Sequence, residues 1–224
     1  MTLLARLDYA GDEILMIAET EIEKTKRVKA VAKETETVDF ILSMEPGSVF
    51  YDLGANVGSY TLIALSRGLE VVAFEASIPN FQRLNENLGL NGFKCKTVCP
   101  PLWSHQTRVE WTDSVPDTPG AALHSMKGGV GDRLAFPLDY WTDPYGPSHL
   151  PMPNYLKIDL DGNELAALQG ATRTLEGASA LLVEHDSEVE SHKDIPALLE
   201  GLGFKEGSRH PHGTSSVTNV IWRR

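Results

Sequence analysis

A loop with two glycines, preceded by an aspartate, is the segment of this sequence best suited to hold a small ligand. The loop reads DLGANVG from Asp52 to Gly58, and it lies between an apolar stretch, residues 48–53, and a helical pattern that begins at residue 59. Gly54 and Gly58 allow the backbone to turn sharply and a ligand to approach the main chain closely. Asp52 would then lie at the carboxyl end of a strand, where open α/β sheets bind their ligands.

The charges around this loop indicate which ligand it binds. Asn56 stands where a dinucleotide fingerprint has its middle glycine, and the carboxylate of Asp52 would repel a pyrophosphate. Glu75 ends the next apolar stretch, 17 residues after Gly58, where a carboxylate can accept hydrogen bonds from both ribose hydroxyls. One acid for an amine and one for a ribose suit S-adenosylmethionine, which is cationic and has no phosphate, better than NAD. The alternative is a loop that serves only as a tight turn between strand and helix.

These considerations predict a set of eight residues that contact the cofactor. Leu102 and Trp103 follow the third expected strand, where they would flank the adenine ring, although core packing explains them equally well. The predicted contacts are Asp52, Gly54, Ala55, Asn56, Gly58, Glu75, Ala76 and Leu102.

A second group of charged residues lies at the ends of the next two expected strands. Lys157 and Asp159 alternate along one strand and therefore share a face, and Glu184 and His185 end the strand after it. A hydroxyl that attacks a methyl sulfonium must lose its proton, and a carboxylate or a neutral imidazole within hydrogen-bond reach can take it. We predict that Asp159 or His185 is this base. Lys157 would hold Asp159 ionised or stabilise negative charge on the acceptor oxygen.

This second group also has other interpretations. Asp159, Asp161 and Glu184 could hold magnesium, which would acidify the acceptor, but no metal ligand is assigned. Asp161 and Glu164 have the spacing of a capping box. Lys157 and Asp159 could be a structural ion pair, and His185 could be a surface histidine.

Alternating strands and helices must position these residues. Their order predicts a doubly wound, Rossmann-like α/β fold with a mostly parallel sheet of seven strands. The last two strands are joined by a loop rich in Gly, His and Pro, so we expect an antiparallel hairpin at the sheet edge. The expected strands are residues 48–53, 70–74, 94–98, 155–158, 180–184, 204–206 and 217–222, and the expected helices are 37–44, 59–67, 79–88, one after residue 158, and 195–202.

The beginning of the chain does not follow this alternation. Residues 1–36 are predicted as a small β-rich extension with a hairpin turn at 10–12 and a further strand at 28–31. A run of mixed charge at 21–29 is predicted as a solvated face.

A second exception interrupts the domain formed by residues 37–224. Residues 100–153 hold nine of the 13 prolines and three of the four tryptophans, so they cannot form one crossover helix. The aromatic content argues against disorder. We expect this insertion, with strands at 108–111 and 134–138, to cover the ligand crevice.

Composition limits the classes of function. The net charge of −11 has the wrong sign for a protein that neutralises phosphates, so nucleic acid is not an expected partner. No apolar run is long enough for a membrane span, and acids among the first 20 residues interrupt any signal peptide. Cys95 and Cys99 are interpreted as reduced thiols. We expect a cytoplasmic protein that acts on a small molecule or glycan, with its oligomeric state left open.

The stretch VFYDLGANVGSYTLIAL, residues 49–65, resembles the first motif of class I S-adenosylmethionine-dependent methyltransferases, and specifically of the FkbM family. The resemblance spans about residues 30–224. It implies methyl transfer to a hydroxyl oxygen of a sugar, a polyketide or a similar molecule. One departure is Asp161, where the family usually has the longer Glu. Further matching segments are KETETVDFI (33–41), FPLD (136–139), YLKIDLDGNELAALQGA (155–171), LVEH (182–185) and NVI (219–221).

Three rival functions belong to other classes. An NAD-dependent oxidoreductase is disfavoured by Asp52 and Asn56 and by the lack of a Tyr-x-x-x-Lys pair. A non-catalytic module that binds S-adenosylmethionine is disfavoured by the intact acids Asp159 and Glu184. An RNA methyltransferase is disfavoured by the acidic charge and by the lack of an Asn-Pro-Pro-Tyr motif.

Overall fold

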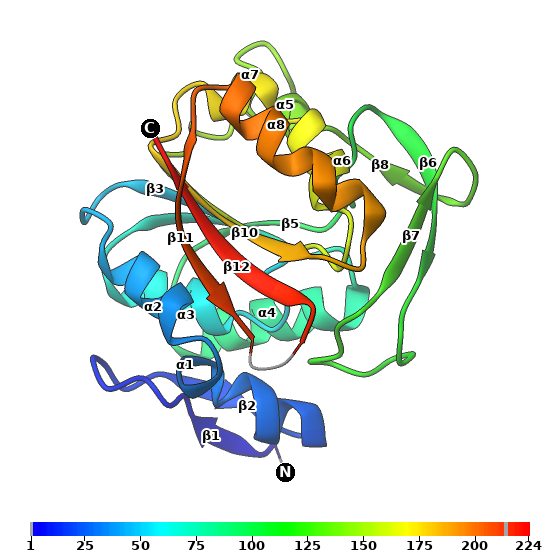
Figure 1. The fold of residues 1–224 in the computed structure, drawn as a ribbon. Helices are drawn as coiled ribbons and strands as arrows, with labels where there is room; N and C mark the ends of the chain where they lie inside the picture. Colours follow the sequence, from blue (N-terminus) through cyan, green and yellow to red (C-terminus); the bar gives the residue numbers. More distant parts are fainter. Residues whose placement is uncertain (1, 213–214) are drawn as a thin grey trace.

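A central sheet of seven strands organises the protein, as a computed structural model that describes residues 2–212 and 215–224 shows (Figure 1). The strand order is β11-β12-β10-β9-β3-β4-β5, in which β12 pairs antiparallel with both β10 and β11 and the other pairs are parallel. The strands are β3 (Val49–Leu53), β4 (Glu70–Phe74), β5 (Lys96–Val98), β9 (Tyr155–Ile158), β10 (Ala180–Asp186), β11 (Lys205–Pro211) and β12 (Val217–Arg223).

The order of strands reverses between β3 and β9. From β3 the chain continues outward through β4 to β5, and β9 then returns to the other side of β3. In a doubly wound sheet the crevice at such a reversal, outside the carboxyl ends of the strands, is where ligands bind. The loops that follow β3, β4 and β9 therefore define the region to search for a site.

Two apolar layers bury the sheet, because side chains alternate along its central strands. Phe50 packs into the cluster on one face and Tyr51 into the cluster on the other. The first face is covered by α2 (Thr35–Leu42), α3 (Ser59–Ser66) and α4 (Ile78–Leu90), and the second by α5 (Leu138–Trp141), α6 (Glu164–Gln169), α7 (Thr172–Leu175) and α8 (Ile195–Gly201).

The N-terminal extension is only partly β. Strands β1 (Leu4–Arg6) and β2 (Leu15–Ile17) form the expected hairpin. The strand predicted at 28–31 is wrong, because the chain continues through the π-helical turn η1 (Glu23–Arg27) into α1 (Ala30–Lys33). The physical reason is a distant cap. The carboxylate of Asp8 accepts hydrogen bonds from the backbone N–H groups of Val31 and Ala32, which satisfies the first turn of α1.

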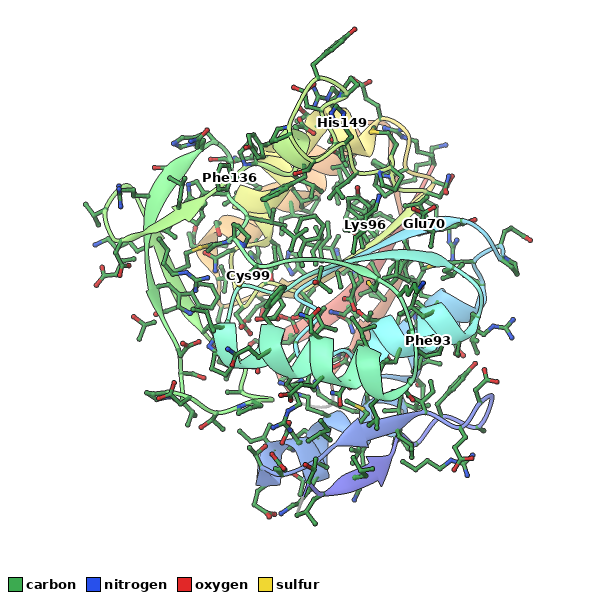
Figure 2. The ribbon with its side chains drawn as sticks, turned by 180° about the vertical axis from the view of Figure 1, so that it is seen from behind. Glu70, Phe93, Lys96, Cys99, Phe136 and His149 are labelled. Atoms are coloured by element: carbon green, nitrogen blue, oxygen red, sulfur yellow. The ribbon has the colours of Figure 1, made fainter. Side chains whose placement is uncertain are left out.

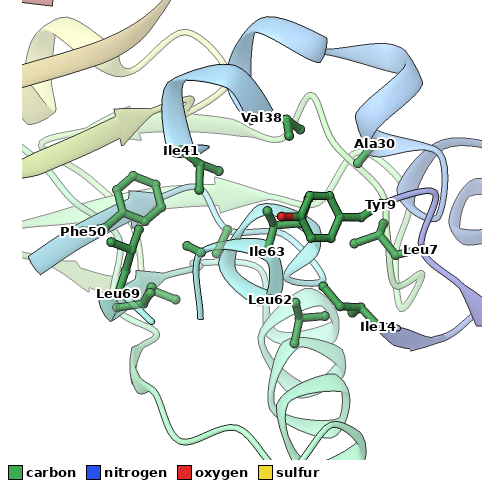
Figure 3. Packing of buried hydrophobic residues seen from close by; sticks show 14 of the residues in the cluster. Leu7, Tyr9, Ile14, Ala30, Val38, Ile41, Phe50, Leu62, Ile63 and Leu69 are labelled. Atoms are coloured by element: carbon green, nitrogen blue, oxygen red, sulfur yellow. The ribbon is translucent and has the colours of Figure 1, made fainter. Parts of the chain in front are cut away.

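The extension shares the core of the rest of the chain. Leu7, Tyr9 and Ile14 are buried in the same cluster as Leu62 and Ile63 of α3 (Figure 3). The extension is therefore held in place by the same apolar contacts that hold α3 on the sheet.

The insertion of residues 100–153 is more regular than expected. Strands β6 (Thr107–Thr112), β7 (Ser125–Gly128) and β8 (Arg133–Ala135) form a small antiparallel sheet in the order β7-β6-β8. The strand predicted at 134–138 ends at Ala135, since Pro137 precedes α5. In the view from behind, the chain runs from Phe93 past Lys96 to Cys99 (Figure 2). Cys99 lies on the side of the molecule where this small sheet is found.

Among the described residues, no helix has both the length and the apolar character needed to cross a membrane.

Candidate active site

A cavity of about 900 Å³, open to solvent, lies at the carboxyl ends of β3, β4 and β9. Its floor is made by residues 54–56, 75–76 and 157–161. One wall is the extension wall, residues 26–34, and the other is the cover wall, residues 101–126 of the insertion. Of the 11 predicted site residues, eight line this cavity: Gly54, Ala55, Asn56, Glu75, Ala76, Leu102, Lys157 and Asp159.

Gly54 joins two parts of the floor. Its φ of +87° lies in the left-handed region, and a Cβ atom there would be 1.8 Å from the carbonyl oxygen of Asp159. Only glycine allows the loop after β3 to lie directly against the backbone after β9. The N–H groups of Gly54 and Ala55 both donate to the carbonyl of Phe74, at 2.9 Å, which ties the loop to β4 as well.

Glu75 closes the floor beside this loop. One carboxylate oxygen accepts a hydrogen bond from the N–H of Asn56 at 2.7 Å, and the other accepts from the N–H of Ser77 at 2.8 Å. Burial raises the pKa of Glu75 to about 7, although these two N–H donors oppose the shift. The side chain lines the cavity and is only 6% exposed.

The cover wall is attached to the floor by two side chains. The Asn56 amide donates to the carbonyl of Ala121 at 2.7 Å, and the Asp161 carboxylate accepts from the N–H groups of Leu123 and His124 at 2.8 and 3.1 Å. Asp161, at φ +51°, therefore holds the insertion and does not form a capping box with Glu164. Burial, followed by repulsion from Asp159, raises the pKa of Asp161.

Asp52 lies below the floor of the cavity. It does not line the cavity, because its fully buried carboxylate accepts a hydrogen bond from the Thr61 hydroxyl at 2.6 Å beneath the floor. Asp52 and Lys157 are direct partners in the register of β3 and β9, and their charged atoms are 3.6 Å apart. Burial raises the pKa of Asp52 in spite of Lys157 and Thr61. The contact of Asp52 with the cofactor's amine stays a prediction, and this geometry places the carboxylate below the floor rather than at its surface.

Gly58 also lies outside the cavity lining. Its φ is +96°, and a Cβ atom would be 2.6 Å from the side chain of Leu84. This glycine therefore allows α3 to pack closely against α4, and it shapes the loop from behind.

Lys157 and Asp159 form an ion pair that faces the cavity. The ammonium group is 2.9 Å from Asp159 and lies 5.5 Å from the centre of the Tyr60 ring. Burial alone would lower the pKa of Lys157, but the charges of Asp159 and Asp52 outweigh it and hold that pKa above its usual value. Burial alone would raise the pKa of Asp159, but Lys157 reverses the effect and lowers it. Asp159 is therefore an ionised carboxylate, and its side chain is 30% exposed.

His185 does not line the cavity. Its Nε2 donates to the carbonyl of His192 at 3.0 Å, and burial lowers the pKa of its ring. The role of His185 as the alternative base stays a prediction.

Three carboxylates, that of Asp159 among them, meet at this end of the sheet, but they are not the three that were considered as possible magnesium ligands. Oxygens of Asp159, Glu164 and Glu184 lie within 4.8 Å of one another, whereas Asp161 is occupied by the cover wall. Repulsion from Asp159, together with burial, raises the pKa of Glu184 to about 9. Glu164 is 2.7 Å from Nε2 of the buried His192. Asp159 is paired with Lys157, and Glu164 lies beside His192. We assign no metal to this cluster.

Most residues of the two walls were not predicted from the sequence. Lys26 and Arg27 line the cavity although their charged run was predicted as a solvated face, and Glu23 of the same run is fully buried. Trp111 and His124 of the cover wall stack at 5.4 Å between ring centroids. The only early signal for these residues was the aromatic content of the insertion.

Several solved structures with the same fold are methyltransferases. The magnesium protoporphyrin IX methyltransferase of Synechocystis PCC 6803, solved with bound S-adenosylmethionine, has a TM-score of 0.54 and 12% identity, over 92% of this chain and 84% of that one. A tRNA (uracil-54, C5)-methyltransferase of Pyrococcus abyssi has a TM-score of 0.55 and 10% identity, over 99% of this chain and 44% of that one. The fold is that of the Rossmann-like, S-adenosylmethionine-dependent methyltransferases.

Sequence similarity identifies the family. Residues 52–206 match the methyltransferase FkbM domain, so the chain belongs to the FkbM family of S-adenosylmethionine-dependent methyltransferases, as the resemblance indicated. A curated relative is the hexuronic acid methyltransferase AglP of Haloferax volcanii, which is 26% identical over 179 residues, or 80% of this chain and 72% of AglP.

Proposed function

We propose that this protein methylates a hydroxyl oxygen of a sugar or glycan. The observation that carries the proposal is the position of Asp159, which faces the same cavity as Glu75 and the loop of residues 54–56 and is kept ionised by Lys157. The relative from Haloferax volcanii, which acts on a hexuronic acid, supports a sugar as the acceptor.

The floor and the cover wall suit S-adenosylmethionine. Glu75 keeps free lone pairs on both oxygens after it accepts two N–H groups, so it can also accept the ribose hydroxyls. Ala76 and Leu102 give an apolar surface for the adenine ring beside it. The loop of residues 54–56 lines the floor, where the rest of the molecule would lie. None of these contacts requires a phosphate group on the ligand, which suits S-adenosylmethionine better than NAD.

Methyl transfer to a hydroxyl requires that the acceptor oxygen be positioned against the methyl group and that one group accept its proton. Bound S-adenosylmethionine supplies a methyl group that its sulfonium makes electrophilic. Holding the acceptor oxygen in line with that methyl group supplies much of the rate enhancement. The hydroxyl becomes strongly acidic only as its new C–O bond forms, so a carboxylate of low pKa such as Asp159 is a sufficient base. Lys157 acts as a positioning residue, because it fixes the rotamer and the charge of Asp159.

Two other acceptors remain to be compared with sugars. A polyketide-type hydroxyl requires the same chemistry, and tRNA is the substrate named for one of the structures with this fold. We also propose that the protein acts in the cytoplasm, since both cysteines are free thiols.

Incubation with labelled S-adenosylmethionine and separate panels of sugars, polyketide alcohols and transcribed tRNA tests the proposal. We expect label in the sugar panel only, as a methyl ether that resists mild base. Label in RNA, or label that mild base releases as methanol from a carboxyl ester, would contradict it. Donor binding without transfer to any panel would favour the non-catalytic alternative.

A further inference from the structure

The extension wall carries two cations, Lys26 and Arg27, that form no ion pair with a carboxylate of the described residues. Lys26 lies exposed at the mouth, and Arg27 lies half-buried beside it. Both belong to the π-helical turn η1, which precedes α1. Turns of this kind are rare and occur often at functional sites.

The other charged side chains of the cavity already have polar partners of their own, and the charge of Arg27 also acts on Glu75 and Asp159, where it lowers the pKa of each carboxyl. Glu75 and Asp161 accept backbone N–H groups, Asp159 is paired with Lys157, and Glu34 is 2.5 Å from the ammonium group of Lys33. Within residues 2–212 and 215–224, no carboxylate lies within 4 Å of the charged atoms of the two η1 cations, Lys26 and Arg27. The Nε of Arg27 donates to the carbonyl of Gly120 at 2.8 Å, which leaves its terminal N–H groups for a ligand. Two positive charges thus face the cavity in a chain whose net charge is −11.

Buried contacts hold the turn that carries these cations. The Glu23 carboxylate accepts the N–H groups of Glu19 and Thr20 at 2.9 and 2.8 Å, and it pairs at 2.5 Å with Arg83 of α4. The backbone carbonyl of Arg27 accepts the hydroxyl of Ser59 at 2.8 Å. The wall is therefore fixed relative to the floor before a ligand arrives, and such pre-organisation favours affinity.

We propose that Lys26 and Arg27 bind a carboxylate group of the acceptor, so that the enzyme selects an acidic sugar over its neutral counterpart. This inference rests on the proposed function, because it names the class of sugar that the site takes. A guanidinium and an ammonium suit a carboxylate, to which both can donate charge-assisted hydrogen bonds. The carboxylate of the methyl donor has the same chemistry, so the experiment must distinguish these two sources.

The test measures binding by calorimetry, first of S-adenosylhomocysteine to the protein and then of sugars to that binary complex. The sugars are D-glucuronate, D-galacturonate and D-mannuronate, each paired with its neutral amide of the same shape. We expect at least one acid to bind about tenfold or more tightly than its amide. The preference should weaken as ionic strength rises, since part of the lysine's attraction is screened.

Variants assign the preference to residues. Lys26→Gln combined with Arg27→Gln should remove the preference for the acid and leave the affinity for S-adenosylhomocysteine within about threefold. Lys24→Gln is the matched control, because Lys24 belongs to the same turn but pairs with Glu21 at 2.8 Å and does not line the cavity. It should leave the preference unchanged.

Three results would overturn the inference. These are equal binding of acid and amide, no binding of any acid to the binary complex, and a double variant that loses affinity for S-adenosylhomocysteine itself. The last result would assign the cations to the donor's carboxylate. If S-adenosylhomocysteine did not bind to the unmodified protein, the proposed function would fail and not only this inference. The single variant Lys26→Gln, which removes no contact within the described protein, provides the same comparison if the double variant does not fold.

Discussion

The floor of the cavity and its two walls are held in different ways. The floor consists of loops that directly follow β3, β4 and β9, and its contacts are between backbones of adjacent strands, such as Gly54 against Asp159. The walls come from segments outside the central sheet, the N-terminal extension and the insertion of residues 100–153. They are attached by single side chains, such as Asn56 to Ala121 and Asp161 to Leu123. Substitutions in the floor should therefore lower the free energy of unfolding or the reaction rate most. Substitutions in the walls should change the affinity for ligands more than the stability of the fold.

The largest effect is expected for the reactive end of the floor. Asp159→Asn removes the proton acceptor and should lower the rate of methyl transfer by about 10²–10⁴-fold. The affinity for S-adenosylhomocysteine should change by less than about threefold. The measurements are single-turnover transfer and calorimetry on the same preparation. Full activity in this variant would exclude Asp159 as the base.

A methyl group at Gly54 should break the floor itself. Gly54→Ala would be both strained at φ +87° and in collision with the Asp159 backbone. We expect a loss of about 3 kcal/mol or more in the free energy of unfolding. Gly47→Ala is the matched control, since its φ is +83° but nothing lies within 4 Å of a Cβ atom there. It should cost only about 1 kcal/mol. Urea unfolding measures both, and equal losses would show that the contact with Asp159 is unimportant.

The attachment of a wall should matter less to stability and more to affinity. Asp161→Ala removes the acceptor of the Leu123 and His124 N–H groups, so the cover wall should loosen. We expect S-adenosylhomocysteine to bind about tenfold more weakly and the amides of Leu123 and His124 to exchange faster with deuterium. Asp132→Ala, an exposed residue of the same insertion, serves as the control. Unchanged exchange in Asp161→Ala would contradict the attachment.

The smallest effect is expected from pH. Because the pKa of Glu75 is about 7, the folded protein keeps a proton at pH 6 that it has lost at pH 8. The affinity for S-adenosylhomocysteine should therefore rise by up to about tenfold from pH 6 to pH 8. Glu75→Gln should flatten this rise, and calorimetry at both values of pH checks it.

The same raised pKa has a defined effect on stability without ligand. The ordinary pKa of this carboxyl is 4.5, so between pH 4.5 and 7 the folded chain holds a proton that the unfolded chain has released. Stability must then fall as the pH rises through this range, so far as Glu75 contributes. If the free energy of unfolding instead increased with pH over this range, and if that increase were absent in Glu75→Gln, the pKa of Glu75 would not be raised.

The difference between floor and walls also explains what the sequence could predict. The floor residues lie within a few positions of expected strand ends, so alternation and glycine spacing located them. The position of Asp52 below the floor was not predicted, because the end of a strand does not show which face a side chain takes. Here β3 directs it beneath the floor toward Thr61 and Lys157.

The walls were not predictable because their contacts span the chain. Asp8 caps a helix more than 20 residues away, and Arg27 reaches Gly120. A run of mixed charge has the same pattern whether it faces solvent or a cavity. His185 shows the same limit, since its partner His192 is set by the packing of the loop after β10.

The central claim is that the floor binds S-adenosylmethionine through Glu75 and the loop of residues 54–56. Calorimetric titration of the protein and of Glu75→Ala with S-adenosylhomocysteine, and in parallel with NADH, tests it most directly. We predict saturable binding of S-adenosylhomocysteine to the protein, a loss of at least about tenfold in Glu75→Ala, and no binding of NADH. Unchanged affinity in Glu75→Ala, or tighter binding of NADH than of S-adenosylhomocysteine, would contradict the account.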